Sequence, residues 1–201
     1  MLVIQDVDVL DKNKLKIVKR KSKKTQILLY DTQRKIEDFV QKLKYRKNGK
    51  YEDIPHFIVS KTGNIFRVFD SNHTSNTFNN PKIDRKQIKI AIENLGWLNK
   101  NTISGHYTNW IGDAHRSDPY IKQWRNNFYW DRYTDIQMEM ISSLCDHLCE
   151  KHDIFKQHVP SQAYFENISK FNGIVCKSNF SNIYTDINPS YNFRTIFNHA
   201  K

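Results

Sequence analysis

The sequence predicts an α/β protein in which a mixed central β-sheet is flanked by helices. Three observations lead to this prediction. Short β-prone runs alternate along the chain with two stretches of helical periodicity, so strands and helices are interleaved. The chain has only 6 Gly and 5 Pro, with no linker-like stretch and no internal repeat, which favours a single domain over residues 1–201. Apolar residues make up 38% of the chain, enough to build a core.

The N-terminal part predicts strands followed by a helix. Residues 15–19 and 25–30 (TQILLY) are β-prone, and the basic stretch 19–24 between them predicts a solvent-exposed hairpin connection. Residues 1–24 are therefore assigned to an N-terminal strand and basic turn. Residues 34–45 carry apolar side chains at helical spacing and predict an amphipathic helix.

The next elements are a hairpin and a strand. Residues 56–60 (HFIVS) and 65–69 (IFRVF) flank a short polar connection that contains Gly63. Glycine supplies the positive φ that a tight turn needs, so these runs predict a β-hairpin. Residues 88–92 (IKIAI) predict a further strand.

The C-terminal third predicts a helix, a strand and a second, shorter helix. Residues 134–151 have one apolar stripe at helical spacing, behind Thr134 or Asp135 as the capping residue. Residues 173–176 predict the last strand, and a short helix is expected from about Ser190.

Residues 97–132 lose clear periodicity but contain all four tryptophans and several tyrosines. A long insertion so rich in aromatic residues is expected to be ordered. It has two interpretations. The aromatic rings can form a glycan-binding wall, with Arg125 or Arg132 pairing with ligand carboxylates, or they can form a small core of their own. We favour the second interpretation.

The charge of the chain restricts its partners. Lys and Arg number 32 against 21 Asp and Glu, a net charge of +11 that favours an anionic partner such as a cell-wall polymer, nucleic acid or acidic lipid. No apolar stretch approaches the roughly 18 residues of a membrane-spanning helix, so no membrane span is predicted. The N-terminus lacks the pattern of an export signal, and the 3 cysteines are expected to be reduced thiols, which favours a cytoplasmic location.

Four segments occur in the order found in one family. HFIVSKTGNIFRVFD resembles its strand-turn-strand unit, and KIAIENLGWL resembles its Ile-Gly-Ile-Glu strand, with Ala91 at the usual glycine. Tyr133, Thr134 and Gln137 match its Tyr-Thr-x-x-Gln helix start, and GIVCKSNF with YTDINPSY resembles its closing loop and tail. Over residues 25–193 the sequence thus resembles the type-2 N-acetylmuramoyl-L-alanine amidases, which share their fold with peptidoglycan recognition proteins.

The resemblance implies a set of site residues. Members of this family cleave the amide between the glycan lactyl group and the stem peptide, using zinc held by two histidines and an Asp or Cys. The corresponding positions here are Tyr30, Lys177 and Asp186, so Asp186 is a remnant metal ligand. Glu93 falls at the position of the glutamate that ends the family's Ile-Gly-Ile-Glu strand, and Tyr184 falls where the family has a lysine in its C-terminal tail. Both therefore mark remnant catalytic positions.

This set predicts a protein that has lost zinc hydrolysis. One carboxylate does not hold zinc against water, and a lysine ammonium repels the cation. We therefore expect no cofactor, and a cell-wall-binding or protein-binding module, phage-encoded and located in the host cell or virion. The predicted ligand groove comprises Tyr30, His73, Lys177, Trp97 and Trp110.

Two alternatives remain open. The first is an active amidase that serves as an endolysin, with zinc in a shifted site formed by His73, Cys176 and Asp186. The second is a nucleic-acid- or polymerase-binding regulator, which the net charge of +11 and the basic residues 12–24 suggest. No helix-turn-helix or aromatic RNA-binding motif supports this second alternative.

Overall fold

A computed structural model describes residues 2–6, 17–45 and 53–197. Its centre is a six-stranded sheet in the order β1–β5–β4–β7–β3–β13. The strands are β1 (Ile4–Asp6), β3 (Gln26–Asp31), β4 (Phe57–Val59), β5 (Ile65–Arg67), β7 (Gln87–Ile92) and β13 (Gly173–Cys176). Strands β4 and β5 are antiparallel and the other neighbours are parallel, so the predicted mixed sheet is confirmed.

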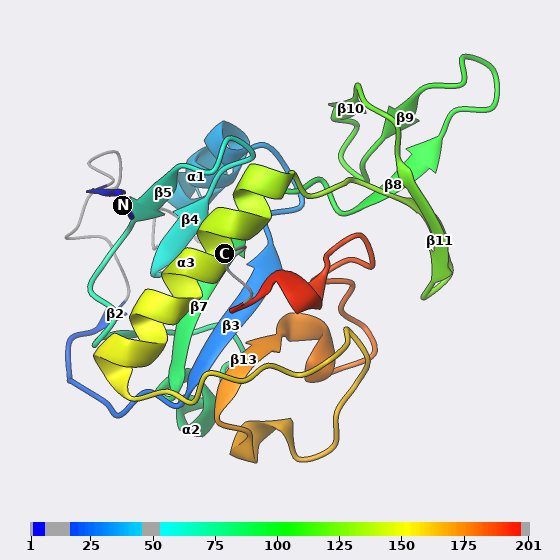
Figure 1. Ribbon diagram of the computed structural model, residues 1–201. Coiled ribbons are helices and arrows are strands. Elements are labelled where there is room, and N and C mark those ends of the chain that lie inside the picture. Colours follow the sequence, from blue (N-terminus) through cyan, green and yellow to red (C-terminus); the bar gives the residue numbers. More distant parts are fainter. Residues whose placement is uncertain (1, 7–16, 46–52, 198–201) are drawn as a thin grey trace.

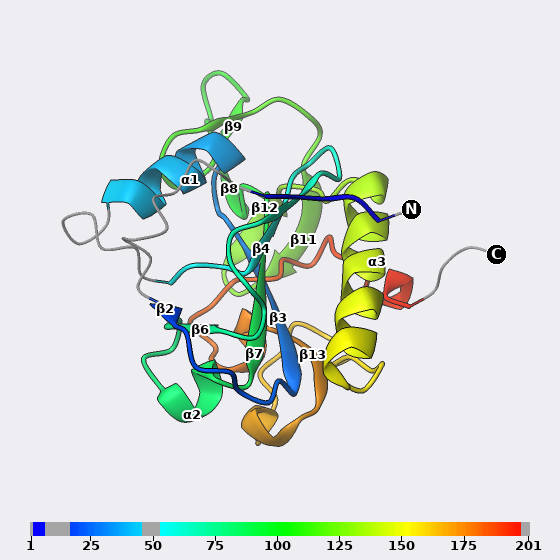
Figure 2. The ribbon, with the colours of Figure 1, turned by 90° about the vertical axis from the view of Figure 1, so that its left-hand side faces the viewer.

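Helices cover both faces of this sheet. Helix α1 (Ile36–Tyr45) lies on one face and α3 (Asp135–His152) on the other, as Figures 1 and 2 show. Alternate residues of β3 point to the two faces: Leu28 packs in the cluster on the α1 side, whereas Leu29 packs in the cluster on the α3 side. No helix in the described part of the chain has the length and apolar character needed to cross a membrane.

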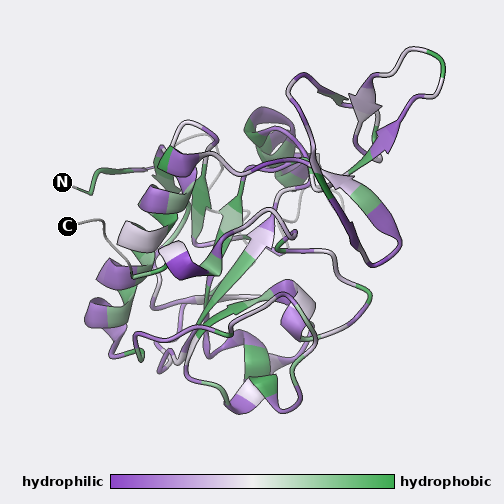
Figure 3. Ribbon diagram, turned by 45° about the vertical axis from the view of Figure 1, so that its right-hand side comes forward, coloured by the Kyte–Doolittle hydropathy of each residue, from purple (hydrophilic) through white to green (hydrophobic). Residues whose placement is uncertain are grey.

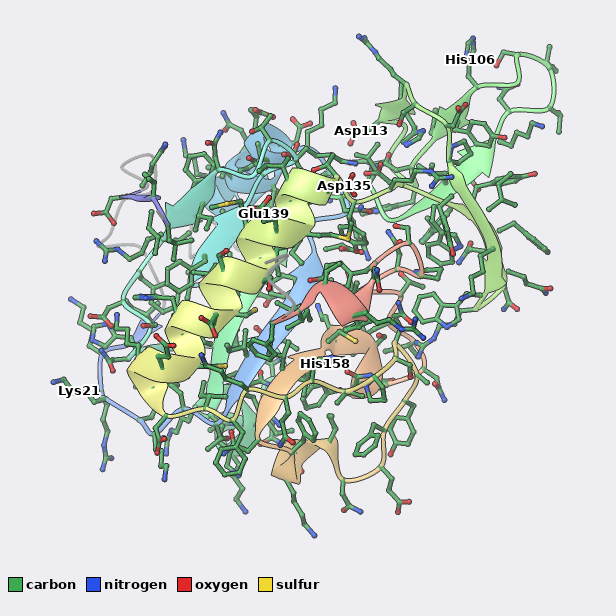
Figure 4. All side chains as sticks on the ribbon, viewed as in Figure 1. Lys21, His106, Asp113, Asp135, Glu139 and His158 are labelled. Carbon is green, nitrogen blue, oxygen red and sulfur yellow. The ribbon has the colours of Figure 1, made fainter. Side chains whose placement is uncertain are left out.

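The hydropathy of the elements follows these layers. Hydrophobic residues run along the central strands in Figure 3, because the sheet is covered on both sides. The exposed side of α3 carries Asp135 and Glu139, which point away from the sheet in Figure 4. All three cysteines are buried, free thiols.

Most of the predicted elements of the main sheet are confirmed. The hairpin at β4 and β5 turns at Gly63, whose φ is +80°. Helix α3 begins where the sequence predicted, because the Thr134 hydroxyl accepts a hydrogen bond from the Gln137 backbone N–H at 3.1 Å. The short α2 (Pro81–Asp84) was missed, although Asn80 before a proline is a helix-start signal.

The predicted N-terminal hairpin is wrong. Strand β2 (Ile17–Val18) pairs antiparallel with β6 (Thr74–Ser75) and not with β3, while residues 15 and 16 lie outside the described residues. Lys24, predicted to be solvent-exposed, is 1% exposed. Its ammonium donates to the backbone carbonyls of His73 at 2.6 Å and Arg85 at 3.1 Å, and these acceptors compensate for its burial.

The predicted C-terminal helix is also wrong in part. The chain after Ser190 forms only a single 3₁₀ turn, η4 (Phe193–Thr195), and residues 198–201 lie outside the described residues. Two further 3₁₀ turns, η2 (Ile168–Lys170) and η3 (Lys177–Asn179), flank β13.

Residues 97–132 form a second sheet that projects from the body of the molecule (Figure 1). Its antiparallel order is β10–β9–β8–β12–β11. The strands are β8 (Trp97–Lys100), β9 (Tyr107–Thr108), β10 (Ala114–His115), β11 (Tyr120–Trp124) and β12 (Asn127–Trp130). Trp130 is fully buried and packs against Trp124 at 5.4 Å, whereas Trp110 is 46% exposed. The insertion therefore combines a small aromatic core with an exposed aromatic ring.

Candidate functional site

A cavity of about 360 Å³, here called the site cavity, opens at the carboxyl end of β3. Five residues that the sequence assigned to the site line it: Tyr30, Trp110, Lys177, Tyr184 and Asp186. They come from β3, from the projecting sheet, and from residues 177–186 after β13, here called the site loop. The fold thus brings together segments far apart in the sequence.

Lys177 supplies a positive charge inside the site cavity. Its ammonium lies 5.4 Å from the ring centroid of Tyr30 and 5.0 Å from that of Tyr184, within the range of cation–π attraction. Burial raises the pKa of the nearby Asp186 carboxyl, and the charge of Lys177 opposes this rise. The two aromatic rings and the carboxyl group together stabilise a cation that belongs to the protein.

Asp31 and Asp186 form a buried acidic pair beside Lys177. The Asp31 backbone N–H donates to Asp186 Oδ1 at 3.1 Å, and the Tyr133 hydroxyl donates to the Asp31 carboxyl group. Burial, together with the charge of Asp186, raises the pKa of Asp31 well above its usual value. The two carboxyl groups therefore resist ionising together.

The Tyr-Thr-x-x-Gln motif at the start of α3 helps to hold the Asp31–Asp186 pair in place. Tyr133 also accepts a hydrogen bond from the Asn188 backbone N–H at 3.3 Å, and Gln137 donates to the carbonyl of Glu93 at 2.9 Å. The start of α3 is thereby joined to the end of β7 and to the chain just after the site loop. These contacts give a physical reason for the Tyr-Thr-x-x-Gln pattern.

The donor set of the site cavity does not fit a zinc ion. Zinc in proteins is held by imidazole, thiolate and carboxylate groups in a tetrahedral arrangement. Here a phenol stands at Tyr30 and an ammonium at Lys177, and the ammonium cannot donate an electron pair. Within residues 2–6, 17–45 and 53–197, no three His, Cys, Asp or Glu side chains are grouped to hold a metal ion.

The alternative ligand set is not brought together. His73 lies beside β6, where its carbonyl accepts hydrogen bonds from Lys24 and from His56 Nε2 at 3.1 Å, and it does not line the site cavity. The Cys176 thiol is buried in the core on the α3 side, and burial raises its pKa to about 11. It contacts Asn179 Oδ1 at 3.0 Å.

Two other predicted site residues lie outside the site cavity. Glu93 accepts hydrogen bonds from the backbone N–H groups of Ile36 at 3.3 Å and Lys61 at 2.8 Å, so it fixes the start of α1. Trp97 is half-buried in β8 and pairs with Trp130 across the projecting sheet. Neither side chain lines the site cavity.

Sequence reasoning missed the role of Arg125, which holds the site loop. Its guanidinium donates to the carbonyls of Ser181 at 3.0 Å and Ser178 at 3.3 Å and to that of Tyr184. The expectation that Arg125 pairs with a ligand carboxylate stays a prediction, and the structure adds this internal role to it. No local signal could reveal this role, because its partners lie more than 50 residues away in the sequence.

A second tether joins the insertion to the main sheet. Asn109 Nδ2 donates to the Gln33 carbonyl at 3.0 Å, and Asn109 Oδ1 accepts from the Asp113 backbone N–H at 2.8 Å. Asp113 lies near the body of the molecule in Figure 4, whereas His106 lies farther out. The tether fixes the loop that carries Trp110 over the site cavity.

Replacing Arg125 by alanine is expected to loosen the site loop. Three backbone carbonyls would lose a charged donor, and we expect a fall of about 1 kcal/mol in the free energy of unfolding. The larger effect is local and is measured as faster amide hydrogen exchange over residues 177–186. The exposed Arg20→Ala variant serves as control. Unchanged exchange in the loop of Arg125→Ala would contradict the assigned role.

Comparisons with known proteins identify the family. The family model described as N-acetylmuramoyl-L-alanine amidase matches residues 22–170, most of the chain, and ends before β13 and the site loop. A search of curated proteins finds no match.

Several solved structures are similar to this chain. The endolysin amidase LysCS from Clostridium intestinale URNW is 13% identical, with 88% of this chain and 81% of that chain covered and a TM-score of 0.47. A mutant endolysin from Bacillus subtilis is 16% identical, with 87% and 84% covered and a TM-score of 0.45. The ectodomain of the Drosophila receptor PGRP-LCa is 11% identical, with 68% and 69% covered and a TM-score of 0.42. On the strength of the family model, which matches from the residues before β3 through η2, the chain belongs to the N-acetylmuramoyl-L-alanine amidase family.

Proposed function

We propose that this protein binds peptidoglycan in the site cavity and does not hydrolyse it through zinc. Membership of the amidase family supports a cell-wall polymer as the partner. The observation that carries the proposal is the position of the Lys177 ammonium, which lies over the rings of Tyr30 and Tyr184 beside Asp186. A protein-borne cation thus lies among the residues that the sequence resemblance assigns to the positions of the metal ligands.

The site cavity offers suitable contacts for a glycopeptide. The Lys177 ammonium has three N–H donors for amide carbonyl oxygens. Trp110 is 46% exposed at the cavity, and Arg34 lies 5.6 Å from its ring centroid. An exposed indole face is able to stack on a sugar ring. The net charge of +11 also favours association with an anionic wall polymer.

The test combines metal analysis with two assays on purified cell-wall sacculi. We expect zinc well below one equivalent per chain, sedimentation of the protein with sacculi, and no release of stem peptides. Stoichiometric zinc with peptide release would overturn the proposal and support the active endolysin. Absence of sedimentation, with binding to nucleic acid at low salt, would support the regulator instead.

A matched pair of variants tests the cavity itself. Trp110→Ala is expected to weaken binding to sacculi about fivefold, since stacking contributes on the order of 1 kcal/mol. Phe128→Ala is the control, because Phe128 is 50% exposed on the same sheet but does not line the site cavity. Equal losses in both variants would place the binding surface elsewhere on the sheet.

A further inference from the structure

A second cavity, of about 450 Å³, lies next to the end of β7 and is here called the side cavity. Its charged and titratable lining residues are Lys35, Lys61, Glu93, His115, Arg116 and Asp131. The loop between β3 and α1 contributes to both cavities, because Arg34 lines the site cavity and Lys35 lines the side cavity.

The acidic groups of the side cavity already accept hydrogen bonds from other groups of the protein. Both Glu93 oxygens accept backbone N–H groups, as described above. Asp131 Oδ1 accepts from Lys61 Nζ at 2.5 Å and His115 Nε2 at 3.1 Å, and Asp131 Oδ2 accepts from the Leu95 N–H at 2.8 Å. Burial of Asp131 opposes ionisation, but the hydrogen bond from His115 and the charge of Lys61 lower its pKa overall. Its carboxylate is therefore charged and satisfied.

Two cationic side chains in the same cavity have hydrogen-bond donors that can bind a ligand. Lys35 and Arg116 are exposed, and among the described residues neither side chain has a hydrogen-bond or ion-pair partner. An ammonium and a guanidinium carry only donors, so their unmet requirement is for acceptor oxygens. A planar guanidinium pairs best with a carboxylate or a phosphate.

His115 provides the independent observation. It is 8% exposed, and its Nδ1 has no hydrogen-bond partner in the described part of the chain. In the tautomer whose Nε2 donates to Asp131, Nδ1 is an acceptor that a ligand N–H or O–H group would satisfy. A buried polar atom without a partner is costly, which suggests that a ligand supplies one.

These residues do not form a serine-protease-like relay. Ser117 Oγ lies 3.2 Å from the same ring nitrogen, Nε2, that contacts Asp131. In such a relay the hydroxyl and the acid contact opposite nitrogens of the histidine. The arrangement is therefore suited to binding rather than to nucleophilic catalysis.

We propose that the side cavity binds a peptide carboxylate, with Arg116 and Lys35 on the carboxylate and His115 Nδ1 accepting from the neighbouring amide N–H. The assignment of that peptide to peptidoglycan rests on the proposed function. The binding chemistry does not, because it follows from the donors and acceptors of the side cavity alone.

The probe is N-acetylglutamate, which carries carboxylates beside an amide N–H, titrated into the full protein and followed by NMR. We expect saturable shifts at His115 and Arg116, no binding of the diamide of the probe, and at least tenfold weaker binding in Arg116→Gln and in Lys35→Gln. Lys122→Gln removes an exposed charge of β11 outside the cavity and is expected to leave binding unchanged.

Each contrary outcome has a distinct meaning. Equal binding of N-acetylglutamate by wild type and Arg116→Gln, or no binding at all, would overturn the carboxylate site. Saturable binding of inorganic phosphate without binding of N-acetylglutamate would also overturn it and would identify a phosphate site. Sedimentation with sacculi is measured separately, so loss of the proposed function with retained probe binding remains distinguishable from the reverse.

Discussion

Replacing Tyr30 and Lys177 together by histidine is expected to give a protein that binds about one zinc ion per chain. The double variant removes the ammonium that repels a cation and places two imidazoles beside Asp186, which already lines the same cavity. Two imidazoles and a carboxylate are a suitable ligand set for zinc, with a fourth position open to water. Metal analysis after dialysis, with a zinc titration, measures the change.

Three controls make this result specific. Tyr30→His alone keeps the Lys177 ammonium and is expected to bind no stoichiometric zinc. Lys177→His alone supplies one imidazole and is expected to bind zinc weakly. Adding Asp186→Asn to the double variant should abolish the gain. If the double variant binds no zinc while its fold is intact, these residues do not surround a common metal position, and the prediction that a zinc site was lost here is wrong.

Replacing Asp31 by asparagine is expected to stabilise the protein at neutral pH, since a carboxyl group whose pKa is raised by folding costs free energy when it ionises in the folded state. Asp31 is 5% exposed, and burial and the charge of Asp186 raise its pKa well above the usual value. Folding therefore opposes its ionisation. An amide resembles the protonated acid, and its oxygen can still accept from the Tyr133 hydroxyl.

The pH dependence gives the sign of this effect. The folded state holds the Asp31 proton more tightly than the unfolded state, so stability falls as pH rises from the unfolded pKa of about 3.9 through the raised folded value. The advantage of Asp31→Asn should be present at pH 7 and should disappear below about pH 4. Chemical denaturation at both pH values measures it. The exposed Asp118→Asn variant is the control, and an equal effect at both pH values would contradict this explanation.

The main sheet could be predicted because its signals are local. The hairpin at Gly63 and the helix start at Thr134 are specified by neighbouring residues, and the period of apolar residues separates helices from strands. The pairing of β2 with β6 and the burial of Lys24 were not predicted. Both depend on partners about 50 residues away, which composition and periodicity do not encode.

Those residues of the candidate site that lie in family-like sequence motifs could be predicted from the sequence. Tyr30, Lys177, Tyr184 and Asp186, which the sequence resemblance assigned to the site, line one cavity. His73 was placed in the groove only because of its position along the chain, and it lies elsewhere. The side cavity was not foreseen, because the hydrogen bond between His115 and Asp131 forms only when the projecting sheet folds.

The guanidinium of Arg125 makes the projecting sheet a structural support of the site loop rather than a removable appendage. Because Arg125 lies in residues 97–132 and its acceptors lie in residues 178–184, a change that moves either segment alters these contacts. Engineering that transplants this loop into another scaffold needs to move both segments together.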